Sequence, residues 1–572
     1  MFDELSASVF CVTPRRVPVA TLWDGVPPET VGQPTCSAPP IPVRPCPVCP
    51  RLDQEFEPWR QAAYWKSMHQ RATAREQLLQ QEIQQLQARV RFLEQQCFGR
   101  KSEATAAAPT APASVQQPAT APPRSRGQQP DRPAPKRRSY DHLPTVEEPR
   151  VLPEAQQQCP QCGQPLVSFP RCEESTVLEV EVRAHRRLIR RHCYQPTCTC
   201  GCQPGIITAP PPPKVIPKSF LGVSVWVSVL LDKYLFYRPT YRLLAEWRTH
   251  GFDLALGTVT GGLQQLLPLF EPVYDALVAH SRKQPLWHAD ETRWLVFATV
   301  EGKVGYRWYL WVFHAAEVVV FVLAMGRSHE VPEDQLGPDA KGILVVDRYS
   351  AYKAIDQVKK GHITLAFCWA HVRRDFLEVA RSWPQLESWG LEWIERIGEL
   401  YRRNDARLEV LEKPELFAAA DQQVREQVEQ LSTRAKEELS KADLHPAARR
   451  TLESLGDHWT GLTVFVEHPE VPMDNNTAER AERGPVVGRK NYYGSGAVWS
   501  GRLASMLFSL LQTLSLWDLN PRAWLTAYLN ACAEAGGQAP ASGELEKLLP
   551  WRLSEAQKQA WSLSPAKEEN TS

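Results

Sequence analysis

The pattern of apolar and polar positions changes several times along the chain, and each change predicts a different kind of structure. Leu79, Ile83, Leu86, Val90 and Leu93 follow one another in steps of four and three residues, within a segment rich in Gln, Arg and Glu. This spacing places the five apolar side chains along one seam of a helix. It predicts a short coiled coil for self-association, with a lone helix packed on its own domain as the alternative.

Apolar residues at helical steps return in Val223–Trp247 and in Thr258–Ala279, so each of these segments is predicted to be a helix. Gly251 and Gly257 punctuate the connection between them. The pair could form a helix-turn-helix-like arrangement, but packing against the following domain is the interpretation that we favour.

The next part of the chain is typical of strands. Leu286–Thr292, Tyr306–Phe313 and Val318–Ala324 are β-rich runs with little room for helices between them, which favours an antiparallel meander. Gly342–Tyr349 contains four consecutive apolar residues, which indicate a strand buried on both faces, and Asp347 follows them. Its carboxylate is expected at the carboxyl edge of the sheet, where open α/β sheets place their functional sites.

Acidic residues on these strands suggest chemistry. Asp290 stands at the centre of the first strand and could meet Asp347 on an adjacent one. Two carboxylates brought together in this way repel each other unless a divalent cation neutralises them. The best third acid is Glu479, on a helix that Asp474 or Asn475 could cap. We therefore expect a site of hard oxygen ligands, which Mg²⁺ prefers.

Basic and aromatic residues follow the third acid. Arg480 and Arg483 can flank Glu479 on its helix, and Gly488–Ser495 is predicted to be a loop suited to contacts with the DNA backbone or with splayed bases. Arg381–Glu470 has helical periodicity and holds 18 acids against 12 Lys and Arg. It is predicted to be an all-helical insertion and a poor candidate for the main DNA track.

Length and composition narrow the class of protein. A chain of 572 residues has room for about three to five domains. Its hydrophobic fraction of 43% and charged fraction of 23% exclude a wholly disordered or fibrous protein. The formal charge of +1 shows no global basic excess, so any nucleic-acid surface must come from local patterning. Arg124–Arg138 is such a pattern, either a basic tether for phosphates or a solubilising linker.

Cysteine spacing predicts a structural zinc site. Seven of the 14 cysteines lie within Cys159–Cys202, which favours metal ligation over a disulfide framework and points to a reducing, cytoplasmic compartment. Cys159 and Cys162 form one pair of ligands. The return pair comes from the later cysteines, with Cys198 and Cys202 at the commoner spacing and Cys200 as the alternative to Cys198.

Neither a membrane span nor a secretory signal is expected. The uncharged runs Ser219–Leu231 and Leu503–Trp517 are shorter than the roughly 18–20 apolar residues that a span needs. Met1–Ala20 lacks a basic start followed by an apolar stretch.

Four motifs occur in one order along the chain: His288–Thr292, Val346–Tyr352, Cys368–Phe376 and Asp474–Arg480. Together they resemble the signature blocks of the IS66 family of insertion-sequence transposases, the large catalytic protein of those elements. The likeness covers most of the chain from about Leu79 onward and extends to four further segments, Phe98–Glu103, Cys159–Cys202, Gly488–Asn491 and Leu548–Trp551.

The resemblance implies an α/β fold with a ribonuclease-H-like catalytic core that contains an all-helical insertion and is preceded by a coiled-coil helix and a zinc-binding module. It also implies a catalytic Asp-Asp-Glu triad of Asp290, Asp347 and Glu479 that holds two Mg²⁺ ions, with Asp290 as the shared ligand. Such a pair of ions clamps the attacking and leaving oxygens of an in-line phosphodiester substitution. The expected reactions are hydrolytic nicking at the ends of the element and attack of the freed 3′-hydroxyl on target DNA.

DNA is thus the expected partner, both as element ends and as target. The expected phosphate contacts, for each of which a structural salt bridge is the alternative, are Arg373, Arg374, Arg480, Arg489 and Lys490. His371 is expected to be a packed core histidine. Synapsis of two ends favours a homo-oligomer, and accessory transposition proteins are a further possible partner.

Rival functions remain for the sequence alone. A nuclease on the same fold would cut without joining, a regulator would bind DNA without cutting, and a structural zinc-and-coil scaffold would leave the three acids unexplained. The expected organisation begins with a disordered leader (1–56), a coiled-coil segment (57–103), a basic linker (104–150) and the zinc-binding module (151–215). A helical DNA-binding or packing segment (216–284) follows. The first part of the core (285–380), the insertion (381–470), the second part of the core (471–535) and a tail (536–572) complete the chain.

Overall fold

The computed structural model describes residues 49–98, 184–194 and 206–563, together with residues 145, 161, 164 and 165; within the first range, side chains are described for residues 61–91. The chain divides into two compact units, Met1–Leu86 and Gln87–Ser572. Most of the predicted leader, of the basic linker and of the zinc-binding module lies outside the described residues. Residues 49–56, which the prediction placed in a disordered leader, belong to the helix Cys49–Phe98, so the leader prediction is wrong there.

One long helix, α1 (Cys49–Phe98), contains the predicted seam. The helical prediction for this segment is therefore confirmed. The side chains of Leu79, Ile83, Leu86 and Val90 are all exposed, as expected for apolar residues that a single chain leaves uncovered. Pairing of this helix with a second copy stays a prediction.

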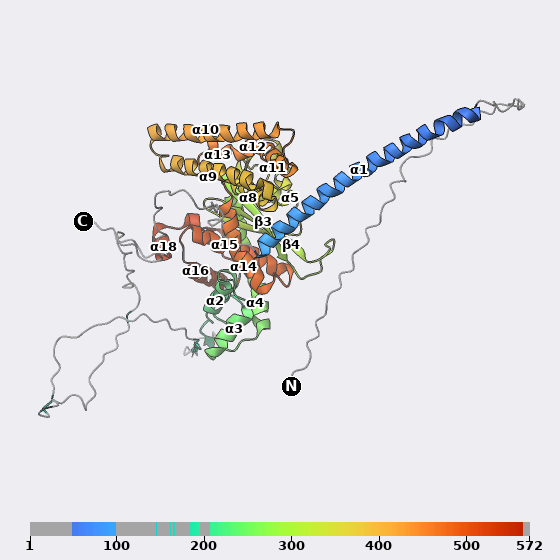
Figure 1. Cartoon of the computed structure of the whole chain (residues 1–572). Coiled ribbons are helices and arrows are strands. Elements are labelled where there is room, and N and C mark those ends of the chain that lie inside the picture. Colours follow the sequence, from blue (N-terminus) through green and yellow to red (C-terminus); the bar gives the residue numbers. More distant parts are fainter. Residues whose placement is uncertain are drawn as a thin grey trace, which may run out of the picture. The chain divides into compact units, whose positions relative to one another are not determined.

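A five-stranded mixed sheet lies at the centre of the larger unit (Figure 1). Its first three strands pair antiparallel with their neighbours in the chain, which confirms the predicted meander. The last two run parallel to the first, with the strand order β5-β4-β3-β6-β7. The bounds are β3 Leu286–Leu295, β4 Arg307–His314, β5 Val319–Ala324, β6 Gly342–Val346 and β7 Ile363–Phe367.

Strand β6 is buried on both faces, as its apolar run predicts, because Leu344, Val345 and Val346 have no exposed surface. Its first residue, Gly342, has a φ of +146°, and a Cβ there would stand 2.0 Å from the carbonyl oxygen of Pro285. The missing side chain lets β6 approach the start of β3, where Ile343 N donates to that same oxygen at 2.9 Å.

Two helices from the C-terminal part pack on the sheet, α14 (Asn476–Tyr492) on β3 and β4 and α15 (Val498–Leu516) on β5. Helix α15 also protects the outer edge of β5. Phe321 N donates to Ser509 Oγ at 2.7 Å, and Val319 N donates to Thr513 Oγ1 at 3.0 Å. These hydroxyls, one helical turn apart, satisfy backbone groups that an edge strand would otherwise leave unpaired.

The predicted helix Val223–Trp247 is wrong as a single element. It is divided into α2 (Val223–Tyr234) and α3 (Thr240–Thr249), and Thr258–Ala279 is confirmed as part of α4 (Leu256–Ser281). Pro239 explains the break, because a proline inside a helix lacks the N–H for a hydrogen bond and its ring clashes with the carbonyl four residues earlier, here that of Leu235, the C-cap of α2.

The insertion is helical, as predicted. Within it, α9 (Glu387–Glu409) packs against α10 (Pro414–Leu439) and against α8 (Trp369–Ser382), the helix that leads into the insertion, while α12 (Trp459–Leu462) and α13 (Val464–Glu467) contact β7. In Figure 1 these helices gather on one side of the sheet, away from α2 and α3. The two remaining helices of the insertion are η3 Pro384–Leu386 and α11 Pro446–Asp457.

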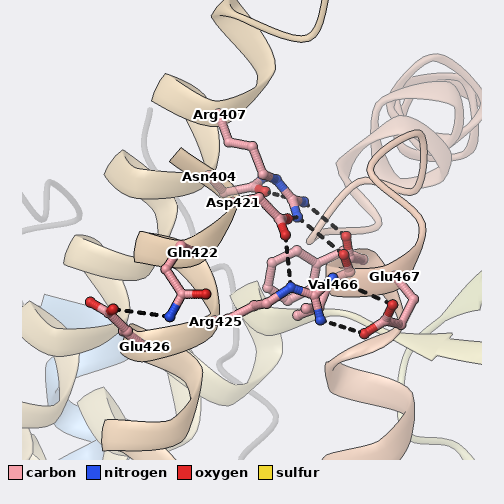
Figure 2. Close-up of polar contacts among 9 residues, drawn as sticks. Asn404, Arg407, Asp421, Gln422, Arg425, Glu426, Val466 and Glu467 are labelled. Carbon is pink, nitrogen blue, oxygen red and sulfur yellow. Dashed lines mark hydrogen bonds and ion pairs between the residues drawn. The ribbon is translucent and has the colours of Figure 1, made fainter. Parts of the chain in front are cut away.

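A buried arginine ties the insertion to the segment that returns to the core (Figure 2). Arg407 of α9 has a fully buried side chain and pairs with Asp421 of α10 at 2.9 Å. It also donates to the carbonyl oxygens of Phe465 and Val466 at 2.8 and 3.2 Å and to Asn404 Oδ1 at 2.7 Å. One guanidinium thus holds α9, α10 and α13 together.

The remaining described elements are short, apart from α16. They are β1 Cys193–Tyr194, β2 Ile207–Thr208, α5 Glu330–Leu336, α6 Ser350–Lys353, α7 Asp356–Lys359, α16 Pro521–Glu534, α17 Ser542–Glu546, η4 Pro550–Arg552 and α18 Glu555–Ala560. None of the helices in the described ranges is long and apolar enough to cross a bilayer.

Candidate active site

The two predicted aspartates lie on neighbouring strands. Strands β3 and β6 pair in parallel with His288 opposite Val345. Asp290 comes two residues after His288, and Asp347 two residues after Val345, so the two acids stand at the same level of the sheet. Their adjacency, inferred from strand patterns, is confirmed.

Asp290 is half-buried on β3, and burial is the largest influence on its carboxyl group. Burial raises the pKa of its carboxyl group to about 7, and the negative charges of Glu291, Asp347 and Glu479 raise it further, against a lowering hydrogen bond from Glu291 N. That bond reaches Asp290 Oδ1 at 2.9 Å. The influence of Asp347 and Glu479 on this pKa places the three predicted acids in one electrostatic neighbourhood.

Asp347 follows β6 at a turn. Its Oδ1 accepts a hydrogen bond of 2.9 Å from Tyr349 N, just before α6 begins. The carboxylate therefore shapes the loop that follows it. This is the position expected for an acid at the carboxyl edge of a parallel strand.

Glu479 lies in the first turn of α14, close to a histidine of the first turn of α8. His371 Nε2 stands 3.9 Å from Glu479 Oε1, and His371 Nδ1 is buried without a hydrogen-bond partner among the described residues. Burial lowers the pKa of His371, with Arg374 acting in the same direction and Glu479 and Asp347 against it. His371, expected to be only a core residue, thus faces two of the three acids.

A network that the sequence pattern did not reveal braces the two aspartates. Glu291, next to Asp290, has a fully buried side chain that pairs with Arg327 and accepts a 2.7 Å hydrogen bond from Tyr352 OH. The Arg327 guanidinium lies 3.7 Å from the ring centroid of Tyr349, the residue that bonds to Asp347. No motif spacing links these residues, because three separate segments contribute them.

Glu482, three residues after Glu479, is a second unforeseen acid. It is 8% exposed, and its Oε1 has no hydrogen-bond partner within the described part of the chain. Burial raises its pKa to about 9, and the charges of Asp290 and Glu291 raise it further. Its place on the same helix face as Glu479 was visible in the sequence, but its burial was not.

The protonation of Glu482 predicts a pH-dependent stability. When the pKa of a carboxyl group is higher in the folded than in the unfolded protein, its contribution to stability is complete below the unfolded pKa. This contribution is lost as the pH rises from the unfolded pKa to the folded pKa. In metal-free buffer, raising the pH from 5 to 8 should therefore destabilise the wild type more than Glu482→Gln, by up to about 1.4 kcal/mol per pH unit. Urea unfolding with EDTA at both pH values measures this difference.

The exposed Glu546 on α17 offers a control, because Glu546→Gln makes the same chemical change at the surface. It should follow the wild-type pH dependence. An identical pH dependence in Glu482→Gln and wild type would contradict the assigned protonation.

The acids have the chemistry of a hard-cation site but not a closed ligand set. Carboxylate oxygens suit Mg²⁺, and the orphaned, buried Glu482 Oε1 adds a further oxygen near Asp290. Among the described residues, however, no three His, Cys, Asp or Glu side chains form a group that could hold one metal ion. The donor types therefore fit a divalent cation, while their present arrangement leaves them apart.

The side chains predicted to contact DNA differ in their exposure to solvent. Arg374, Arg480 and Lys490 are exposed. Arg489 is half-buried and donates to Thr292 Oγ1 at 3.1 Å and to Arg293 O. Its side chain therefore links α14 to β3. Arg373 is half-buried on α8.

The predicted loop Gly488–Ser495 is wrong in its first part, because α14 continues to Tyr492. Tyr493 then ends the helix with a φ of +64°, and Ser495 N donates to Leu295 O at 2.8 Å. The C-terminal end of α14 is therefore fixed to the end of β3. The five predicted zinc ligands, Cys159, Cys162, Cys198, Cys200 and Cys202, lie outside the described residues.

Comparisons with known proteins identify a family and several relatives of this chain. The model of the transposase IS66 family matches residues 218–503, a range that includes all three acids. The uncharacterized protein y4jD of Sinorhizobium fredii is 27% identical over 63% of this chain and 72% of its own length. Two others from the same organism, y4hP and y4qI, are 25% and 26% identical over 72% and 75% of this chain and 76% and 80% of their own lengths.

Proposed function

Because the chain belongs to the IS66 transposase family, we propose that it cuts DNA at the ends of an insertion element and joins the resulting 3′-hydroxyl ends to target DNA. The observation that carries this proposal is the placement of Asp290, Asp347 and Glu479 near one another at one edge of the sheet, although the described residues do not form a closed metal site there. They come from two adjacent strands and from a helix that packs on one of them, and the last two both raise the pKa of the first.

The core is proposed to be ribonuclease-H-like. Three antiparallel strands followed by two parallel ones, with helices on the sheet, support this assignment. The helical insertion lies between the second and third acids, as the resemblance implied. Such a core brings acids that are distant in sequence to one edge of the sheet.

Asp290, Asp347 and Glu479 are the residues that would hold the Mg²⁺ ions. Two such ions supply positive charge that activates a water or a 3′-hydroxyl and stabilises the leaving oxygen. Because the pKa of Asp290 is raised to about 7, its carboxyl group is partly protonated near neutral pH, and the protonated fraction must lose its proton to act as a ligand. His371 Nε2, close to Glu479, restricts where that carboxylate can lie.

The exposed cations near the acids are proposed to contact DNA phosphates. Arg480 follows Glu479 directly, and Arg374 lies on the same helix as His371. Lys490 extends this basic surface along α14. Such contacts position a duplex without reading its sequence. Arg489 is better explained by its bonds to β3.

Assembly is the remaining part of the proposal. Joining two element ends requires that both be held at once, so we propose a homo-oligomer formed through the exposed seam of α1. A structural zinc ion bound by the cysteines of residues 159–202, and accessory proteins, stay predictions.

A strand-transfer assay tests the function. The full chain is incubated with a supercoiled plasmid and labelled linear DNA that carries the sequences flanking its coding region, in MgCl₂ or in EDTA. We expect cleaved and joined products only with Mg²⁺ and only for the flanking sequences, not for shuffled ones. Cleavage without joining would indicate a nuclease, and binding without cleavage a regulator; either result would contradict the proposal.

A further inference from the structure

Asn475, the residue before α14, has its side chain turned into the protein. It is 1% exposed. Its Nδ2 donates to Ala289 O at 2.7 Å, and its Oδ1 accepts from His288 Nδ1 at 3.2 Å. A carbonyl oxygen only accepts, so these bonds fix the orientation of the amide and place a proton on His288 Nδ1.

The backbone of Asn475 extends the same chain of hydrogen bonds in the other direction. Asn475 N donates to the thiol sulfur of Cys368 at 3.2 Å. Cys368 N in turn donates to Val346 O at 3.1 Å. Cys368 is fully buried at the start of α8, so neither bond competes with water.

The two ends of this chain are the residues immediately before the two aspartates. Ala289 precedes Asp290, and Val346 precedes Asp347. Asn475 lies between these two ends. Its own carbonyl oxygen accepts a hydrogen bond of 3.2 Å from Glu479 N, in the first turn of α14. Three elements that carry the acids are thus joined through one buried asparagine.

Asn475 occupies the N-cap position of α14, where an asparagine side chain usually has a different role. An asparagine before a helix normally accepts from the amide groups of its own first turn. Here Asn475 makes no such bond, and Asp474 Oδ1 accepts from Asn476 N at 3.0 Å instead. The amide of Asn475 is committed to β3, which the neighbouring aspartate makes possible.

We propose that Asn475 is a positioning residue that holds Asp290, Asp347 and Glu479 in register for the reaction. The expected effect on DNA cleavage rests on the proposed function. A buried network with every member bonded specifies one arrangement of its elements, and its loss lets them shift. The acids need not lose any contact with solvent or DNA for their spacing to change.

Asn475→Asp tests the proposal at pH 8, because a carboxylate keeps the shape of the amide but cannot donate to Ala289 O. A misplacement of about 1 Å can lower a rate about 100-fold, so we expect at least that loss in the rate of DNA cleavage at saturating Mg²⁺. The DNA dissociation constant should stay unchanged. Hydrogen exchange in the peptide spanning residues 476–482 should become faster.

Asn476→Asp is the matched control, since it makes the same change one residue later, on a half-buried side chain outside this network. It should leave all three measurements at wild-type values. Cys368→Ala removes the acceptor for Asn475 N together with the bonds that the thiol receives from the backbone of Ala370 and His371. It leaves the bond from Asn475 Nδ2 to Ala289 O in place, so it should accelerate the same exchange and lower cleavage less than Asn475→Asp.

Wild-type cleavage in folded Asn475→Asp, or unchanged exchange in residues 476–482, would overturn the positioning role. Should the wild type itself fail to cleave, the proposed function fails, and the exchange comparison between Asn475→Asp and Asn476→Asp still decides whether the asparagine holds α14 to the sheet.

Discussion

Asp347→Asn is expected to abolish Mg²⁺-dependent DNA cleavage while DNA affinity stays at the wild-type level or rises slightly. The asparagine can still accept from Tyr349 N through its Oδ1, so the turn after β6 should persist. What it loses is the negative charge that would hold a cation. Since removing residues that merely support metal ligands costs about 10–100-fold, loss of a ligand should cost more than about 100-fold.

The measurements are the initial cleavage rate on labelled end DNA and the dissociation constant of the same DNA in EDTA. Asp356→Asn is the control, because Asp356 lies nearby on α7 but is exposed and faces Lys359 and Lys360. It should cleave normally. Equal loss of cleavage and binding in Asp347→Asn would show that this acid supports folding or DNA docking, not chemistry.

Arg407→Met is expected to lower the free energy of unfolding by about 3–5 kcal/mol, because removing one partner of a buried pair strands the groups that it satisfied. The carbonyl oxygens of Phe465 and Val466 would lose their donor, as would Asn404 Oδ1. Asp421 would keep Arg425 as its remaining partner, at 2.7 Å. Urea denaturation of the full chain measures the loss.

Arg425→Met provides the comparison within the same network (Figure 2). Arg425 is 41% exposed and pairs with Glu467 at 2.6 Å. Exposed ion pairs contribute about 0–1 kcal/mol, so this variant should stay close to wild type. Similar losses in both variants would contradict the role assigned to Arg407, and hydrogen exchange in α13 would locate any local opening.

The strands and the adjacency of Asp290 and Asp347 were predictable because both follow from local patterns. Short β-rich runs with little sequence between them leave an antiparallel meander as the simplest arrangement. A continuous apolar run such as Leu344–Val346 requires cover on both faces, which fixes it inside the sheet. An acid directly after such a strand must then appear at its carboxyl edge.

Predictions failed where a helix depends on distant contacts. Gly488–Ser495 looks like a loop from its glycines and polar residues, yet α14 continues to Tyr492 because it packs along β3 and β4. His371 and Glu482 were equally hard to assign, since the same residues on an exposed helix would have no special role. Burial against segments more than a hundred residues away gives them their position.

From its sequence the protein could be assigned an order of strands and helices, three candidate acids and a family likeness, because these depend on residues close together in the chain. Only the tertiary structure decided which groups surround the acids. These groups are the Glu291–Arg327 pair, the buried and unbonded Glu482 oxygen and the Asn475 network, and each depends on segments that the folded sheet brings together. Hydrogen bonds and desolvation act through space, so a linear pattern cannot specify their partners.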